Sequence, residues 1–133
     1  MKNHIIIASH GGLAKGMADT AGLFGVQNVT AIEQTVQETG FESQVQRVLE
    51  QYKDENVVVF TDILGGSVNQ IFFKYLRQQP FHLVTGMNLA VILECIFAVE
   101  PITDEFLRNA ISLSREQLCY MNDILNTAQE DDD

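Results

Sequence analysis

The sequence is poor in basic residues, and it contains no tryptophan, only two prolines and only two cysteines. Eight Lys and Arg residues stand against 18 Asp and Glu residues, which gives a formal net charge of −10. Contacts with nucleic-acid phosphates or anionic lipids need Lys and Arg, so this balance argues against nucleic acid and anionic membranes as partners. A basic protein partner is favoured electrostatically instead.

The two cysteines, Cys95 and Cys119, form no CxxC pair and have no histidine-rich surroundings. Both stand in apolar, helix-like runs, so we expect buried free thiols in a reducing cytoplasm rather than a disulfide or a metal site. The first apolar run, from Ile5 to Ser9, is too short for a secretory signal or a membrane span. The length of 133 residues fits one domain. We assign residues 1–129 to it and 130–133 to an acidic disordered tail.

Four short apolar runs recur along the first two thirds of the chain, beginning at Ile5, Val29, Val57 and Phe81. Such β-branched, nearly uninterrupted runs are typical of strands that are covered on both faces. The segments between them have helical periodicity. Strands that alternate with helices predict an α/β fold that is doubly wound, with a mainly parallel four-stranded sheet and helices on both faces. Periodicity leaves the order of the strands open.

The last third of the chain is more helical. Asn88 is a candidate cap for a helix from Leu89 to Val99 that is apolar almost all round, which suggests that a second subunit covers it. Beyond Pro101, apolar residues at a 4-3-4-3-4 spacing predict one long C-terminal helix from Thr103 to about Thr127.

The residues that could carry chemistry follow three of the predicted strands. They are Ser9-His10-Gly11-Gly12 after the first strand, Asp62 and Gly65-Gly66-Ser67 after the third, and Gly86 and Asn88 after the fourth. The carboxyl ends of parallel strands lie at one edge of a sheet, where ligands bind. We therefore expect these loops to meet.

Each of these residues has a use in phosphoryl transfer. Asp62 could accept a hydrogen bond from one ring nitrogen of His10, which would leave the other nitrogen as a nucleophile toward phosphorus. Glycines and a helix N-terminus suit an anion. Ser67, with Gln70 three residues on, has the spacing of an N-cap in a capping box, and its hydroxyl or N–H could also bind phosphate. Taken singly, each residue could equally be structural, as we expect for His4 and His82.

Several other kinds of site are missing from the sequence. It has no GxxxxGK[ST], no GxGxxG after the first strand, no GxSxG and no metal-ligand spacing. We therefore expect neither a nucleotide nor a metal cofactor.

Three segments, IIIASHGGLAKGM, VVVFTDILGGSVNQ and LVTGMNLAVILE, occur in an order and spacing that resemble enzyme IIA of the mannose family (mannose, fructose and sorbose) of the bacterial phosphotransferase system. The resemblance extends over essentially the whole chain. It implies that His10 is the phosphorylated residue and that Asp62 hydrogen-bonds its ring. It also implies a phosphoryl-binding set, to which we assign Gly11, Gly65, Gly66, Ser67, Gly86 and Asn88. Many relatives have Pro where this chain has Val68.

The resemblance further implies partners. The phosphocarrier protein HPr would phosphorylate His10, and His10 would pass the group to a IIB component, which we expect to be a separate chain. The IIB component would serve a sugar that enters through membrane IIC and IID subunits. Members of the family are homodimers. The sugar itself is left open, because specificity belongs to other subunits.

Two other functions remain as alternatives. The phosphotransfer subunit of dihydroxyacetone kinase resembles this chain in fold and in its N-terminal histidine, but it usually has a single Gly before Ser where this chain has Gly65-Gly66. A sensor or binding module that responds to phosphorylation of His10 is also compatible with the sequence. A histidine phosphatase is disfavoured, because Ser9 precedes His10 and no second histidine is well placed.

Overall fold

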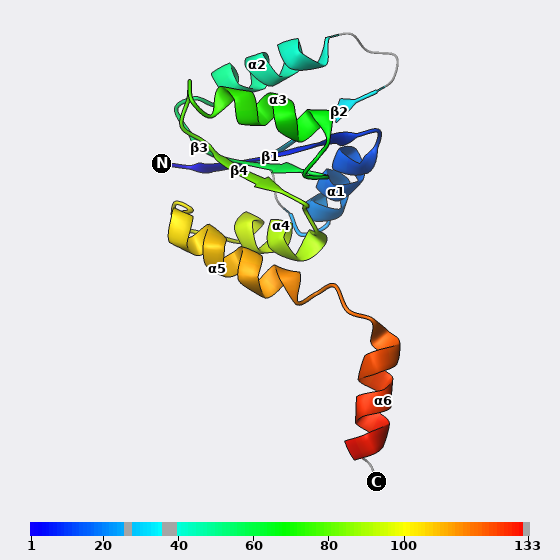
Figure 1. Cartoon of the computed structure of the whole chain (residues 1–133). Helices are drawn as coiled ribbons and strands as arrows, with labels where there is room; N and C mark the ends of the chain where they lie inside the picture. The colour runs from blue at the N-terminus through cyan, green and yellow to red at the C-terminus, as the bar shows by residue number, and fades with distance from the viewer. Residues whose placement is uncertain (26–27, 36–39, 132–133) are drawn as a thin grey trace.

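The structure is a computed structural model that describes residues 1–25, 28–35 and 40–131. Four parallel strands form one sheet in the order β2-β1-β3-β4 (Figure 1). The strands are β1 (Asn3–His10), β2 (Val29–Gln34), β3 (Asn56–Thr61) and β4 (His82–Thr85). They begin within two residues of the runs predicted from the sequence.

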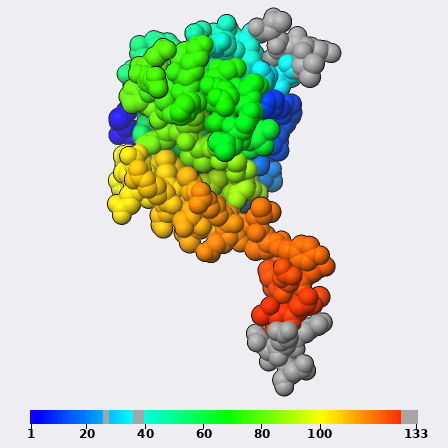
Figure 2. All heavy atoms as spheres, in the orientation of Figure 1, coloured from blue at the N-terminus to red at the C-terminus, as the bar shows by residue number. Residues whose placement is uncertain are grey.

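Helices cover both faces of this sheet (Figure 1). On one face lie α1 (Leu13–Gly22), α4 (Leu89–Ile96) and α5 (Asp104–Arg115), and on the other lie α2 (Phe41–Gln51) and α3 (Ser67–Tyr75). The predicted doubly wound α/β fold is therefore confirmed. A further helix, α6 (Met121–Asp131), stands clear of the sheet and of the helices that cover it (Figures 1 and 2).

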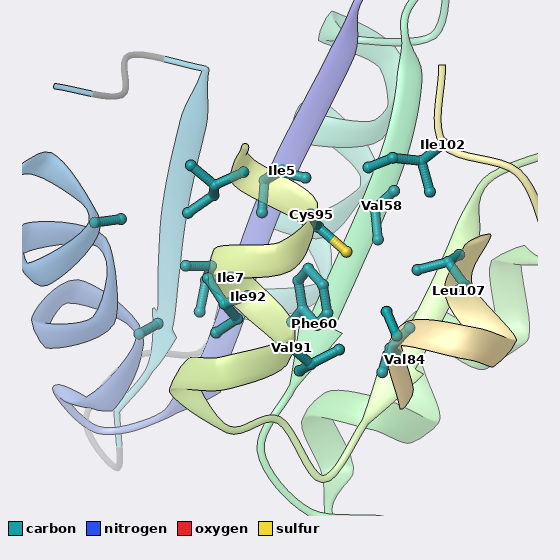
Figure 3. Close-up of a cluster of buried hydrophobic side chains, with 14 residues drawn as sticks. Ile5, Ile7, Val58, Phe60, Val84, Val91, Ile92, Cys95, Ile102 and Leu107 are labelled. Atoms are coloured by element: carbon teal, nitrogen blue, oxygen red, sulfur yellow. The ribbon is translucent and has the colours of Figure 1, made fainter. Parts of the chain in front are cut away.

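The core is built from the alternation of side chains along the two central strands. Ile5 and Ile7 of β1 pack toward α1 and α4, whereas Ile6 and Ala8 pack toward α2 and α3. Figure 3 draws the first of these layers, in which strand side chains meet those of α4, including Ile92. Each fully buried aliphatic side chain of this kind stabilises the fold by about 1.5–3 kcal/mol. The strand β1 is thus packed between two layers of helices, and His10 stands at its carboxyl end.

The strand order explains where a site can form. From β1 the chain moves through α1 to β2, and from β3 it moves through α3 to β4, on the opposite side and over the opposite face. The loops after β1 and β3 therefore diverge, and the carboxyl ends of these two neighbouring strands are where sheets of this kind bind ligands. His10 ends β1 and Asp62 directly follows β3, so both stand at this point.

The prediction of one long C-terminal helix is confirmed only in part. Helix α5 ends at Arg115, and α6 begins only at Met121. The side chain of Asn88 donates to the carbonyl of Ser114, and the hydroxyl of Ser114 donates to the carbonyl of Ala110. The contact from Asn88 occupies a carbonyl of the last turn of α5 from outside the helix, and the Ser114 hydroxyl competes for a carbonyl within that helix. An apolar spacing within one segment cannot reveal such tertiary competition.

Two smaller expectations also need correction. Cys95 is buried as predicted, and burial, with a smaller contribution from Glu94, raises the pKa of its thiol to about 12. Cys119 is exposed, because it lies in the connection between α5 and α6 rather than inside a helix. Helix α6 includes residues 130 and 131 of the predicted acidic tail, and 132–133 lie outside the described residues. The tail boundary therefore stays a prediction.

Candidate active site

The ring of His10 is fixed through one of its two nitrogens. Its Nδ1 lies 2.9 Å from Oδ2 of Asp62, and the backbone N–H of His10 donates to the same oxygen at 2.9 Å. The side chain of Asp62 is only 10% exposed, whereas that of His10 is 42% exposed. The carboxylate thus lies beneath an imidazole that solvent and a partner protein can reach.

The charge of Asp62 determines which nitrogen of His10 carries the proton. Burial alone raises the pKa of this carboxyl, but the hydrogen bonds from the backbone and the ring of His10 outweigh burial and lower the pKa below its usual value. An ionised carboxylate can only accept hydrogen bonds, so Nδ1 of His10 must donate. In the neutral ring, Nε2 then keeps its lone pair, which is the form that a nucleophilic histidine requires.

The second ring nitrogen faces the start of α3. Nε2 of His10 lies 3.3 Å from Oγ of Ser67, and this Oγ donates to Oε1 of Gln34 at 2.6 Å. Ser67 was predicted as an N-cap, but the N-cap of α3 is Gly66 and Ser67 is the first helical residue. Because its hydroxyl is used between His10 and Gln34, it does not cap the helix.

Gln34 was missed by the sequence analysis. It is the last residue of β2 and lies beside His10 in the parallel register. No motif distinguishes a single glutamine at the end of a strand. Only the strand order, which periodicity could not give, shows that β2 neighbours β1.

Glycine is required at one position beside the ring. A Cβ atom on Gly66 would lie 2.7 Å from Cε1 of His10, which is closer than such contacts occur. Gly11 has φ +59° and donates its N–H to the carbonyl of Gln34, so it turns the chain directly after β1. Gly65 is exposed in the loop before α3 and has open space around its Cα.

The N-terminus of α3 supplies positive potential beside the imidazole. The backbone N–H groups of Ser67 and Val68 have no acceptor among the described residues, as is usual for the first turn of a helix. Such N–H groups, together with the helix dipole, bind anions. A phosphoryl group on Nε2 would lie next to the hydroxyl of Ser67.

Within the part of the chain that the structure describes, no hydrogen bond joins Gly86 or Asn88 to His10. Gly86, with φ +74°, forms the turn after β4. Asn88 caps α4 by accepting from the N–H of Val91 at 2.9 Å, and its amide donates to Ser114. Both residues therefore have structural tasks, and their assignment to phosphoryl binding stays a prediction.

The other two histidines lie apart from this site. His4 is buried at the start of β1, where its ring stacks on Tyr52 and its Nε2 lies 2.8 Å from Oγ1 of Thr30. Burial lowers the pKa of His4, although Glu55 acts in the opposite direction. His82, at the start of β4, pairs with Asp104 at 3.4 Å. Both arrangements agree with structural roles.

Over the described ranges, no three Asp, Glu, His or Cys side chains gather in a way that could hold a metal ion. No helix in the described part of the chain is long and apolar enough to cross a membrane.

Comparisons with solved structures agree with this geometry. A protein from Klebsiella pneumoniae, described as a phosphoenolpyruvate-dependent sugar phosphotransferase system permease, has 31% identity and a TM-score of 0.83 over 94% of this chain and 95% of that chain. The mannose/sorbose-specific IIA subunit from Enterococcus faecalis has 18% identity and a TM-score of 0.81, over 90% and 95% of the two chains. The phosphotransferase system component EIIA from Streptococcus agalactiae has 22% identity and a TM-score of 0.79, over 90% and 98%.

A comparison with curated proteins found no match. The profile of the family described as "PTS system fructose IIA component" matches residues 4–111, which is well over half of the chain. This match spans His10, Asp62 and Ser67 together with all four strands except the first residue of β1. The chain therefore belongs to the mannose-type family of enzyme IIA components of the sugar phosphotransferase system.

Proposed function

We propose that this protein is a cytoplasmic phosphoryl carrier that accepts a phosphoryl group from HPr on Nε2 of His10 and passes it to a IIB component. The observation that carries this proposal is the hydrogen bond from Nδ1 of His10 to the carboxylate of Asp62, which in the neutral ring leaves the lone pair of Nε2 free beside the start of α3. Membership of the enzyme IIA family supplies the context of sugar uptake.

The transfer needs only groups that the chain itself provides. The lone pair of His10 Nε2 attacks phosphorus, a new N–P bond forms, and the bond between phosphorus and the donor breaks. Positive charge that develops on the ring is offset by Asp62, whose carboxylate keeps the Nδ1 proton in place. The phosphoryl oxygens meet the N–H groups at the start of α3, which are oriented before the reaction, and they lie beside the Ser67 hydroxyl. Neither nucleotide nor metal takes part, and the same steps in reverse deliver the group to IIB.

The proposal includes a homodimer and an indirect link to membrane IIC and IID subunits through IIB. Support for the dimer comes from large apolar side chains that are exposed on and around α4 and α6, among them Leu89, Phe97, Ile124 and Leu125. Exposed apolar side chains that lie together are typical of protein interfaces.

The proposal is tested by measuring the intact mass of the protein after incubation with phosphoenolpyruvate, enzyme I and HPr. Wild type should gain one acid-labile phosphoryl group, and His10→Ala should gain none. His82→Ala is the matched control, because it removes a histidine that pairs with Asp104 and not with Asp62. Phosphoryl acceptance by His10→Ala would refute the assignment of the carrier residue.

A further inference from the structure

We propose that Gln34 is a positioning residue that holds the hydroxyl proton of Ser67 away from Nε2 of His10, and so keeps this nitrogen available to phosphorus. This inference rests on the proposed carrier function. It assigns a role to a residue at the end of β2 that belongs to no recognised part of the site.

The position of Gln34 is fixed by the sheet. Its Cα pairs with that of His10 in the β1–β2 register, and its carbonyl accepts the N–H of Gly11 at 2.9 Å. The side chain is half-buried and reaches from β2 across the end of β1 to Ser67. A long side chain anchored in this way holds its carboxamide at a defined place relative to the imidazole.

The two distances around Ser67 decide where its single hydroxyl proton points. Oγ lies 2.6 Å from Oε1 of Gln34 but 3.3 Å from Nε2 of His10. An amide oxygen can only accept, and the shorter bond has the length of a strong O–H···O hydrogen bond. The proton therefore points to Gln34, and a lone pair of Ser67 faces the ring.

Removal of the Gln34 acceptor would redirect this proton. Of the two partners of the Ser67 hydroxyl in the structure, the one that remains is Nε2 of His10, which can accept because Nδ1 already donates to Asp62. A hydroxyl that donates to Nε2 occupies the lone pair that must attack phosphorus. Gln34 thus prevents Ser67 from inhibiting the nucleophile before the phosphoryl group arrives.

The test is a double-mutant cycle read by single-turnover phosphoryl acceptance from phosphorylated HPr. Gln34→Leu removes the acceptor and should slow acceptance about tenfold, the effect of one hydrogen bond. In a Ser67→Ala background the same substitution should have no further effect, since no hydroxyl is left to redirect. Gln70→Leu, an exposed position on α3, is the matched control and should leave the rate unchanged.

A second readout separates positioning from a merely structural role. In ¹⁵N spectra, Gln34→Leu should move the resonance of unprotonated Nε2 of His10 toward the hydrogen-bonded range, and the Gln34→Leu/Ser67→Ala variant should not. An unchanged Nε2 resonance, or an equal loss of rate with and without Ser67, would overturn the inference. If wild type accepts no phosphoryl group at all, the proposed function fails. The ¹⁵N spectra would then still show, without any activity measurement, whether Gln34 keeps the Ser67 proton away from Nε2.

Discussion

At the scale of single residues, the candidate site separates the tasks of the two nitrogens of one imidazole. Nδ1 of His10 is hydrogen-bonded to Asp62, whereas Nε2 faces Ser67 at the start of α3. The backbone N–H of His10 also donates to Asp62, so the carboxylate and the ring cannot move independently. The site is therefore organised before a donor protein arrives, which is the condition for efficient electrostatic stabilisation.

Asp62→Asn should lower the rate of phosphoryl acceptance on the order of 10- to 100-fold, because it removes the charge that offsets the developing imidazolium. The fold should persist, since an amide can still accept from the backbone N–H of His10. The measurement is the single-turnover rate from phosphorylated HPr, together with the circular dichroism spectrum. Asp54→Asn, an exposed position in the turn before β3, should behave as wild type. An unchanged rate in Asp62→Asn would mean that Asp62 only stabilises the turn after β3 and takes no part in phosphoryl transfer.

Sequence reasoning works at this scale where chemistry and position along the chain coincide. His10 and Asp62 could be paired because each stands at or just after the end of a predicted parallel strand. Gln34 could not be found in this way, because its role depends on β2 lying beside β1. Gly66 was predicted to bind the phosphoryl group, and the structure adds a steric reason for glycine that the sequence could not show, since a Cβ atom there would meet the His10 ring.

At the scale of elements, Asn88 links the start of α4 to the end of α5. Its Oδ1 caps α4, and its amide group holds the carbonyl of Ser114. The cap was predicted from the sequence, because an Asn directly before an apolar helical run is a local signal. The contact with Ser114 connects residues 26 positions apart. No local sequence pattern could therefore reveal this contact, or show that α5 ends beside it.

Asn88→Ala should lower the free energy of unfolding by about 2 kcal/mol, since it removes a cap and a second hydrogen bond. Thr103→Ala is the matched control, because it removes only the cap of α5 and should cost about 1 kcal/mol. Both values come from urea unfolding at a fixed protein concentration.

The same Asn88 variant distinguishes a structural role of this residue from a role in phosphoryl binding. A preserved rate of phosphoryl acceptance would make Asn88 structural, whereas a large loss of rate would support its predicted place in phosphoryl binding.

At the scale of the whole molecule, the sequence could give the fold class but not the arrangement of the last helices. The alternation of strands and helices predicts a doubly wound sheet. The strand order depends on contacts between distant segments, which the alternation does not show. The acidic balance, with a net charge of −10, favours a basic surface on any protein that approaches His10.

The apolar surface of the last helices gives the final prediction, which concerns the proposed homodimer. Met121, Ile124 and Leu125 have the i, i+3, i+4 spacing of one helical face, and all three are exposed on a helix that stands clear of the domain (Figure 2). In a two-fold dimer each such face is buried twice, which doubles its contribution to association. Light scattering at micromolar concentration should therefore report a dimer for wild type.

Ile124→Asp should weaken this dimer and shift the measured mass toward that of a monomer, because a carboxylate would have to leave water on association. Leu23→Asp changes an equally apolar exposed residue at the end of α1 and should leave the dimer intact. Both variants should keep the rate of phosphoryl acceptance, since neither residue contacts the imidazole of His10. A wild-type monomer would refute the dimer, whereas a dimer that survives Ile124→Asp and dissociates with Leu23→Asp would move the interface from α6 to α1.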